Sequence, residues 1–372
     1  MMPSRNLIMV PMSHKKSSNK MLVILTPGFP KDETDTSCLP FLQDFVRELN
    51  EQAPGLKAVI LAFDYPFMAT SYQWNGNEVI SYNGWRKKNI RRYLKWMIIW
   101  RRLKKINRNQ NIVGLLSLWC GECAFLGNRF AGKYNLPHFC WIQGQDAKKE
   151  NRFVSRIKPG AAELIAISDF NQKDFERNHG FRPGHVIPVG IKLPAAPTDN
   201  VIKDIDILGV GSLIPLKQYN LFIEVIHKIK QYLPVVKTVL CGKGPEERKL
   251  KILIENDRLN ENIGLTGELS REKILAMMSR SKVFLHPSNY EGLSVACLEA
   301  LSSGCHVISF VKPMQYDIEH WHIVQSTGEM MSTALSILNN PGTLYNPVSP
   351  FIVRESVLRI LQLYNYKDSI SC

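Results

Sequence analysis

The chain repeats one local pattern: a short apolar run, a turn that contains glycine, and then apolar residues at helical spacing. In the first unit, the run Met21–Thr26 is followed by a turn at Gly28, helical spacing over Leu39–Leu49, and a second run at Lys57–Ala62. Apolar runs of this length between turn residues are typical of buried parallel strands. A strand, a crossover helix and a parallel strand form the unit of a doubly wound sheet. The pattern therefore predicts an α/β fold.

The pattern recurs in both halves of the chain. We predict further strands at Asn111–Leu118, Pro137–Ile142, Glu163–Ser168, His185–Gly190, Asp204–Val210, Val235–Cys241, Asn262–Thr266, Lys282–Leu285 and, as the last strand, Cys305–Phe310. Leu193–Asn200 is rich in Pro and Ala and reads as a linker. We therefore expect two Rossmann-like domains that face a central cleft, at residues 1–192 and 193–345. A final amphipathic helix is expected at Pro350–Tyr366.

The composition of the 372 residues is that of a globular protein, with 45% hydrophobic and 22% charged residues. No apolar run reaches the roughly 20 residues that span a bilayer. The start, Met1–Lys20, lacks the apolar core of a signal peptide. Eight scattered Cys indicate reduced thiols, so we expect a cytoplasmic protein. The formal net charge of +14 predicts a negatively charged partner.

Arg86–Arg108 is the most unusual segment, with eleven basic residues and no acidic one. Trp85, Tyr93, Trp96 and Trp100 are interleaved with the basic residues at near-helical spacing. A basic helix with Trp on its other side is typical of a helix that lies on anionic lipid. We therefore expect residues 85–109 to bind an anionic membrane surface, with Trp96 and Trp100 in the headgroup region. Two alternatives are a solvated helix whose aromatic residues pack on the domain, and nucleic-acid binding, for which no motif is present.

Polar residues follow two of the predicted strands of the first half. Cys120 and Cys123 have the spacing of a redox pair or half a zinc site, but no second Cys or His pair accompanies them, so no metal site is expected. Glu122 lies at the same turn and is expected to face the cleft and contact an acceptor. In the next loop we expect the same of Asp146, for which the alternative is a helix N-cap.

The stretch Ser288–Ala300 combines a loop and a helix start behind the strand Lys282–Leu285. Free amides at a helix N-terminus favour an anion such as a phosphate. Glu291 and Glu299 flank this point, and a carboxylate can accept two hydrogen bonds from vicinal sugar hydroxyls. The stretch therefore predicts a nucleotide-sugar site. The alternative is a solvated loop Glu and a helix-face Glu.

These residues resemble a known signature. Glu291 and Glu299, with seven residues between them and the opening Glu-Gly-Leu, resemble the donor-site motif of glycosyltransferase family 4. The turn from Gly211 to Lys217 resembles the family's phosphate-binding turn, and Gly242–Pro245 resembles its Gly-x-Gly-Pro turn. Ser212 stands where the family has Arg, and Gln143 where it often has His.

The resemblance implies the GT-B architecture, a cleft active site, and a C-terminal helix that crosses back to the first domain. It also implies that Lys217 carries the charge of the donor diphosphate and that Glu291 binds the donor sugar. Donor contacts are implied for Gly28, Gly211, Ser212, Lys217, Gly242, Gly244, Gly292, Leu293, Ser294 and Glu299. Acceptor contacts are expected for Glu122, Gln143 and Asp146.

The expected function is retaining transfer of a sugar from a nucleotide-diphosphate-sugar, without a metal cofactor. The acceptor is expected to be lipid-linked or part of a cell-surface glycan, and the protein to lie at the inner face of the membrane. We expect no nucleic-acid partner. Two alternatives stay open: a nucleotide-sugar epimerase of the same architecture, and a non-catalytic protein of the membrane surface.

Overall fold

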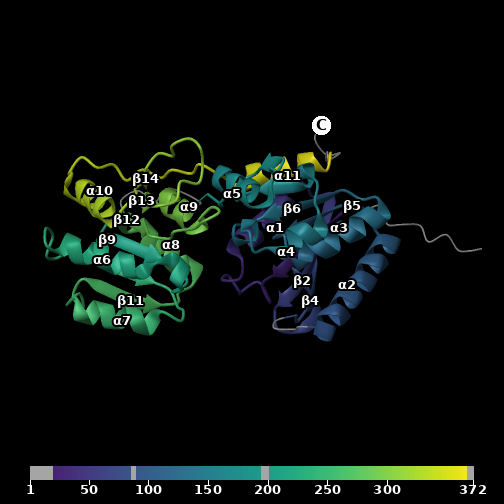
Figure 1. Ribbon diagram of the computed structural model, residues 1–372, viewed down its shortest axis with the longest axis horizontal. Coiled ribbons are helices and arrows are strands. Elements are labelled where there is room, and N and C mark those ends of the chain that lie inside the picture. Colours follow the sequence, from purple (N-terminus) through teal and green to yellow (C-terminus); the bar gives the residue numbers. More distant parts are fainter. Residues whose placement is uncertain (1–19, 85–88, 194–200, 367–372) are drawn as a thin grey trace, which may run out of the picture.

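The computed structural model describes residues 20–84, 89–193 and 201–366. Two α/β domains lie next to each other, each built on a central sheet (Figure 1). The predicted fold class is therefore confirmed. Our predictions for residues 1–19, 85–88, 194–200 and 367–372, which include most of the linker and the first basic residues of the basic segment, lie outside the described residues.

The first domain contains an eight-stranded sheet in the order β3-β4-β2-β1-β5-β6-β7-β8. Its strands are β1 (Lys20–Gly28), β2 (Leu56–Tyr65), β3 (Ala69–Trp74), β4 (Asn77–Tyr82), β5 (Asn111–Leu118), β6 (His138–Ile142), β7 (Leu164–Ala166) and β8 (His185–Val186). Both faces of the sheet are buried: Leu22 and Ile24 of β1 pack into one core cluster, and Val23 and Leu25 into another. Burial on both faces explains the continuous apolar runs in the sequence.

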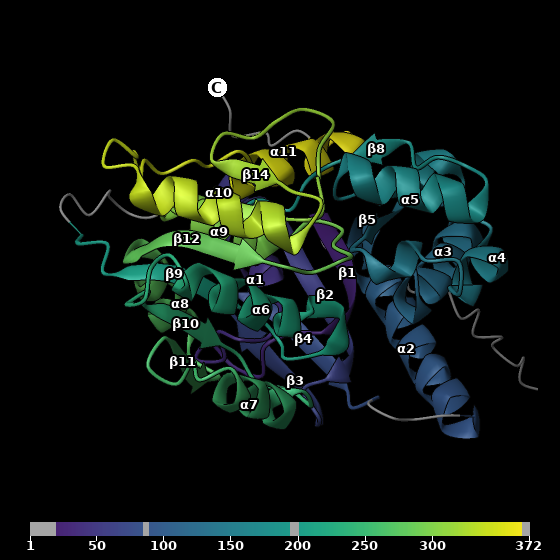
Figure 2. The same ribbon diagram turned by 60° about the vertical axis from the view of Figure 1, so that its left-hand side comes forward.

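Helices cover both faces of this sheet. They are α1 (Pro40–Gln52), α2 (Asn89–Asn109), α3 (Glu122–Tyr134), α4 (Arg152–Ile157) and α5 (Asp169–His179), with short 3-10 turns η1 (Gln145–Ala147) and η2 (Ala161–Glu163). Helix α2 lies at the outer edge of the domain, as Figure 2 shows.

The hairpin of β3 and β4 was not predicted from the sequence. It is the one antiparallel pair among the described strands. Asn75 and Gly76 connect the two strands, and both have positive φ, at 43° and 77°. This is the conformation of a type I′ turn, for which Asn-Gly is the preferred pair. Trp74, next to the turn, is fully buried, so the hairpin belongs to the core.

The second domain contains a six-stranded parallel sheet in the order β11-β10-β9-β12-β13-β14. Its strands are β9 (Ile205–Val210), β10 (Thr238–Cys241), β11 (Ile263–Gly267), β12 (Ser281–His286), β13 (His306–Ser309) and β14 (Trp321–Ile323). This is the strand order of a dinucleotide-binding fold. Our prediction that Cys305–Phe310 holds the last strand was wrong, because β14 follows it. With three residues, β14 is too short to give a recognisable apolar run.

Helices also follow the strands in the second half of the chain. They are η3 (Pro215–Lys217), α6 (Tyr219–Lys230), α7 (Glu247–Asn256), α8 (Arg271–Ser279), α9 (Val295–Ser302), α10 (Thr327–Asn339) and α11 (Val353–Leu363). The last helix, α11, packs on the first domain, above α1 in Figure 1. The Tyr364 hydroxyl donates a 2.7 Å hydrogen bond to the Leu115 carbonyl, and Ser356 donates a 2.8 Å bond to the Pro188 carbonyl.

The residues that helix α2 buries are not those that we expected of an interfacial helix. Trp96 is 9% exposed and packs in the core, and its Nε1 donates a 3.0 Å hydrogen bond to Glu122. The expectation that Trp96 reaches a headgroup region was therefore wrong, because its indole is needed between α2 and α3. The exposed apolar residues of the helix are Ile90, Tyr93, Leu94, Met97 and Ile98. Among the described residues, no helix is long and apolar enough to cross a membrane.

Candidate active site

The carboxyl ends of the parallel strands of the two sheets face each other, and loops from both close a pocket of about 460 Å³, the Lys217 pocket. The first domain contributes loops that follow β5 and β6, and the second contributes η3 and the loop after β12. Ligands of such sheets bind beyond the carboxyl ends of the strands. The pocket is lined by Trp119, Gln143, Gly144, Gln145, Ile214, Leu216, Lys217, Tyr290, Glu291 and Gly292.

Lys217 and Glu291 form an ion pair in this pocket. His286, the last residue of β12, is buried and lies with its Nε2 3.0 Å from Glu291 Oε1. Burial lowers the pKa of His286, so its neutral ring donates Nε2–H to the carboxylate at neutral pH. In the described structure its other ring nitrogen, Nδ1, is buried without a hydrogen-bond partner.

The charge state of Glu291 is set by these two neighbours. Burial alone would raise its pKa, but the hydrogen bond from His286 and the charge of Lys217 outweigh burial and lower the pKa to about 2. Glu291 is therefore ionised at neutral pH and holds the Lys217 ammonium in the pocket. The cluster can present a fixed cation to an anionic ligand and a fixed carboxylate to hydroxyl groups.

A second pocket of about 320 Å³, the Glu299 pocket, lies at the carboxyl ends of β9 and β10. It is lined by Thr36, Ser37, Pro40, Val210, Gly211, Ser212, Cys241, Gly242, Lys243, Glu268, Leu269, Arg271, Ile274 and Glu299. Gly242 is required for this shape, since a Cβ there would lie 1.9 Å from the Gly211 carbonyl oxygen. Thus the two predicted glycine turns lie against each other at the pocket wall.

Arg271 connects Glu299 to the first domain. Its Nε donates a 2.8 Å hydrogen bond to Glu299 Oε1, and its Nη2 donates a 2.7 Å bond to Asp44 Oδ2 on α1. Burial raises the pKa of Glu299, while the Arg271 guanidinium acts in the opposite direction. The carboxylate that was predicted to bind a ribose is therefore paired in this structure with a cation that also bridges the two domains.

Close backbone contact joins the domains beside the Lys217 pocket. A Cβ on Gly292 would lie 2.9 Å from both the Gln143 carbonyl oxygen and the Gly144 Cα. Ser168 Oγ donates a hydrogen bond to the Gly292 carbonyl. The Tyr290 hydroxyl lies 2.9 Å from the Gly144 carbonyl oxygen and 2.8 Å from Asp174 Oδ2. These contacts require glycine at position 292 and hold the two loops together.

The structure brings eight of the predicted residues to the two pockets. Gln143, Lys217, Glu291 and Gly292 line the first, and Gly211, Ser212, Gly242 and Glu299 line the second. Leu293 and Ser294 are buried next to them, and Ser294 caps α9 through a bond from the Cys297 amide. Gly244 packs against the Leu213 backbone.

Besides Gly244, Leu293 and Ser294, three more predicted residues do not line either pocket. Gly28 is buried at the end of β1 against Tyr65 and Cys38, although the loop after it reaches the Glu299 pocket. Glu122 points to α2, where Lys95 Nζ lies 3.0 Å from its carboxylate. The expected cleft position of Glu122 was wrong, because the basic helix binds this carboxylate.

Asp146 is the third of these residues. Its carboxylate accepts hydrogen bonds from the backbone amides of Cys120, Gln143 and Gly144, at 2.7, 3.0 and 2.8 Å. Burial raises its pKa to about 6, although the three amides favour the ionised form. Asp146 therefore stabilises the conformation of the loop that carries Gln143. Its carboxylate does not reach the cleft.

Three residues of the site were missed in the sequence. His286 lies at the carboxyl end of a strand five residues before Glu291, which is a signal that was available. Arg271 and Tyr290 gave no such signal, because their roles depend on Asp44 and Asp174 in the other domain. Cys120 and Cys123 are buried free thiols, and no cluster of metal-ligating side chains occurs in the part of the chain that the structure describes.

Comparison with known proteins agrees with this geometry. Residues 197–322 match the family of glycosyl transferases group 1. The gpi3 subunit of phosphatidylinositol N-acetylglucosaminyltransferase from Schizosaccharomyces pombe is 31% identical over 103 residues, which is 28% of this chain and 23% of that protein. The matches to curated relatives span less than half of the length of those proteins.

Solved structures share the fold over almost the whole chain. A variant of S. aureus TarM, in complex with fondaparinux, alpha-GlcNAc-glycerol and UDP, covers 93% of this chain with 100% of its own, at a TM-score of 0.63 and 13% identity. Sucrose-phosphate synthase from Thermosynechococcus elongatus covers 93% with 98% of its own chain, at a TM-score of 0.69 and 13% identity. The chain thus has the GT-B fold, and residues 197–322 of its second half match the group 1 glycosyltransferases.

Proposed function

We propose that the protein is a retaining glycosyltransferase that moves a sugar from a nucleotide-diphosphate-sugar to a glycan or a lipid-linked acceptor. The observation that carries the proposal is the Lys217–Glu291–His286 cluster between the two sheets. It places one fixed cation and one ionised carboxylate where loops of both domains meet. The similarity of residues 197–322 to group 1 glycosyltransferases supports the same conclusion.

Each part of the site has a role in this proposal. Lys217 stabilises the negative charge that develops on the departing diphosphate, which is the principal task of such an enzyme. Ser212 lines the adjacent pocket and can donate one hydrogen bond, so Lys217 supplies the charge that an Arg at position 212 would otherwise share. Glu291 binds hydroxyls of the donor sugar, and Glu299 binds the ribose. The transfer needs no metal ion in this scheme.

Donor binding at Glu299 changes the contacts of Arg271. A ribose that hydrogen-bonds the carboxylate competes with the guanidinium for Oε1. Arg271 also contacts Asp44 of the first domain, so the donor and the acceptor domain act on the same side chain. We infer that occupation of the Glu299 pocket is coupled to the contact between the domains.

The acceptor side lies in the first domain, where Gln143 lines the Lys217 pocket. A neutral amide positions a hydroxyl but does not act as a base. The exposed basic residues of α2 favour peripheral binding to an anionic membrane at its cytoplasmic face. Such a location brings a lipid-linked acceptor to the cleft.

A donor panel tests the proposal. Purified protein is incubated with nucleotide-diphosphate-sugars and a lipid extract, products are identified by mass, and the anomeric configuration is read by NMR. We expect one donor to be consumed and its sugar to appear on a lipid with the anomeric configuration retained. An epimer of the donor that forms without any acceptor would indicate an epimerase instead. Absence of any donor turnover would contradict catalysis.

A further inference from the structure

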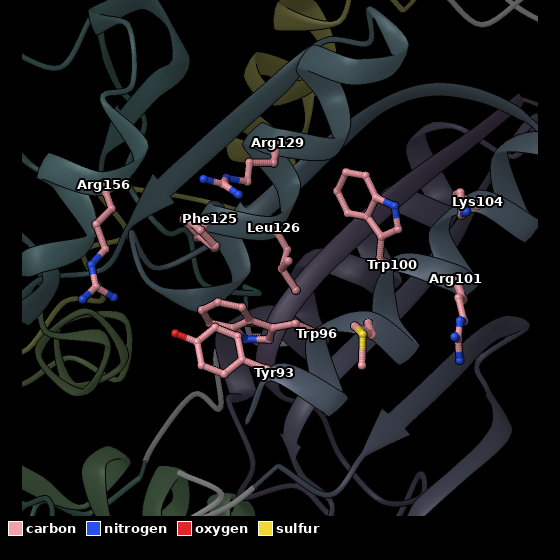
Figure 3. Close-up of a pocket in the computed structure, with 10 residues that line it drawn as sticks. Tyr93, Trp96, Trp100, Arg101, Lys104, Phe125, Leu126, Arg129 and Arg156 are labelled. Atoms are coloured by element: carbon pink, nitrogen blue, oxygen red, sulfur yellow. The ribbon is translucent and has the colours of Figure 1, made fainter. Parts of the chain in front are cut away.

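A groove of about 870 Å³ runs along the outer side of the first domain between α2 and α3 (Figure 3). Aromatic and aliphatic side chains, among them Trp96, Trp100, Phe125 and Leu126, form its floor. Four cations surround this floor: Arg156 at one end, Arg129 along α3, and Arg101 and Lys104 at the other end (Figure 3). None of the described residues that line the groove is acidic. It combines an apolar floor with a positive rim.

The rim cations differ from the other cations of α2. Lys95 pairs with Asp64 at 2.9 Å and with Glu122 at 3.0 Å, and Arg92 and Arg102 lie against Glu122 and Glu78. Arg101, Lys104, Arg129 and Arg156 form no ion pair with any carboxylate of the described residues. Carboxylates of the domain therefore neutralise Lys95, Arg92 and Arg102, the inward cations of α2, and leave the rim of the groove positive.

This charge limits what can occupy the groove. A second copy of the chain carries a formal net charge of +14, so its surface is repelled by the rim. The terminal residues 1–19 include Arg5, Lys15 and Lys16 and no acidic residue, which disfavours that segment as well. An occupant that matches both floor and rim has an extended apolar part and an anionic group.

The surroundings of the groove favour a lipid over an acidic peptide. Ile90, Leu94 and Ile98 of α2 are exposed beside it, with between 46% and 75% of each residue accessible. Such an apolar strip next to basic residues is typical of a surface that lies in the membrane interface. A groove that opens at this level is reached by a lipid directly from the bilayer.

The groove also leads toward the cleft. Helix α3 begins directly after the turn that carries Trp119, and α4 follows the loop Gln143–Asp146. Both of these loops line the Lys217 pocket. Phe125 lies in the first turn of α3, and Arg156 on α4. The end of the groove formed by these two residues is therefore the end next to the cleft.

We propose that the α2–α3 groove is a binding site for one phosphate-bearing lipid, which holds the lipid carrier of the acceptor while its sugar end reaches the cleft. The chain lies on the aromatic floor, and the phosphate binds Arg129 and Arg156. The binding site itself stands on the groove alone, whereas the role of the lipid as acceptor rests on the proposed glycosyltransferase function.

The first test uses a phosphatidic acid with two six-carbon chains, below its micelle concentration, titrated into the full chain by calorimetry. We expect saturable binding of one lipid per chain and at least about tenfold weaker binding of the phosphatidylcholine of equal chain length. Met97→Glu places a charge in the groove and should weaken binding about tenfold or more. Ile98→Glu is the matched control, because Ile98 is equally exposed on the same helix but does not line the groove.

The second test removes the rim charges. Arg129→Gln with Arg156→Gln should weaken phosphatidic acid binding about tenfold or more, since charge-assisted hydrogen bonds are lost. Lys105→Gln with Arg108→Gln removes the same charge from α2 outside the groove and should leave binding unchanged. Melting curves of all variants confirm that each is folded.

Several results would refute the proposal that the groove binds a phosphate-bearing lipid. These are equal binding of the two lipids, equal losses for Met97→Glu and Ile98→Glu, or binding of an acidic amphipathic peptide but not of phosphatidic acid. Failure of the function is separable from failure of the groove. Lys217→Ala should bind the lipid normally while it loses transfer. Transfer to lipid acceptors that persists unchanged in Met97→Glu would contradict the role of the groove in holding the acceptor and leave the glycosyltransferase function intact.

Discussion

The charged residues of the cleft and those of α2 are organised in opposite ways. Lys217, Glu291, Arg271 and Glu299 are largely buried and each has an opposite charge within hydrogen-bond distance. On α2, only the inward cations are paired, and those on the groove side and the outer side are exposed. Pairing fixes geometry at a buried site, whereas unpaired exposed charge attracts an anionic surface with little geometric constraint. Counting basic residues in the sequence does not separate these two uses.

The largest effect is expected where a buried charge loses its partner. Arg271→Met leaves Glu299 buried without a cation and leaves Asp44 with Arg47 alone, at 3.5 Å. The free energy of unfolding should therefore fall by about 3 kcal/mol, the lower end for a broken buried pair. Urea unfolding measures this. Arg280→Met, which breaks the exposed pair with Asp204, is the control and should have little effect. Equal losses in the two variants would remove the distinction between buried and exposed pairs.

Lys217 tests the cleft through catalysis. Lys217→Ala should reduce the transfer rate by about 100-fold or more, as for removal of one contact to the developing charge. Initial rates at saturating donor provide the measurement. Lys249→Ala, which removes an exposed lysine from α7, should keep the normal rate. If Lys217 carries the charge alone, Ser212→Arg should preserve or raise activity. A near-normal rate in Lys217→Ala would refute its assignment.

Two carboxylates give opposite dependence of stability on pH. The pKa of Glu291 is lowered from 4.5 to about 2, so its contribution to the stability of the folded state is present above pH 4.5 and is lost as the pH falls through 2. The pKa of Asp146 is raised from 3.8 to about 6, so its contribution is present below pH 3.8 and is lost as the pH rises through 6. Each pKa unit corresponds to about 1.4 kcal/mol.

Unfolding midpoints between pH 2 and 7 check both signs. Relative to the native chain, Asp146→Asn should remove a loss of stability between pH 4 and 6, and Glu291→Gln should remove a loss below pH 4.5. Midpoints of the native chain and the variants that run parallel over these ranges would show that neither shift exists.

The smallest effect per substituted residue is expected for the basic residues of α2, measured as a loss of vesicle binding. The native chain should cosediment with anionic but not neutral vesicles and should be released by high salt. Lys105→Gln with Arg108→Gln should weaken this binding by roughly 1 kcal/mol per charge. Lys249→Gln with Lys251→Gln removes the same charge from α7 of the second domain and should have no effect. Equal binding to neutral vesicles would contradict an electrostatic account.

The sequence was informative wherever a residue acts through its neighbours in the chain. Buried strands such as β5 and β9 are visible as apolar runs, and the turn at Gly242 is visible because its local sequence resembles a Gly-x-Gly-Pro turn. The hairpin around Asn75–Gly76 had a local signal that was overlooked. These features follow from local conformation and from burial on both faces of a sheet.

Contacts between distant segments could not be predicted in this way. Glu122 follows a strand, as a cleft residue does, yet Lys95 on the preceding helix binds it. Asp146 points to amides under its own loop, and Arg271 joins Glu299 to Asp44 across the domain boundary. In each case the partner is chosen by the packing of two elements, which spacing along one element does not determine.

The central claim is that the cleft holds a nucleotide-sugar donor through Glu299 and Lys217. Titration calorimetry of a nucleoside diphosphate into the native chain and into Glu299→Gln tests it most directly. We predict binding to the native chain that is weaker by about 1.5–3 kcal/mol in Glu299→Gln, because a charge-assisted contact to the ribose is lost. Glu255→Gln, on the exposed side of α7, should bind as the native chain does. Equal affinity in all three proteins, or no binding of uridine, guanosine or adenosine diphosphate to the native chain, would contradict the account.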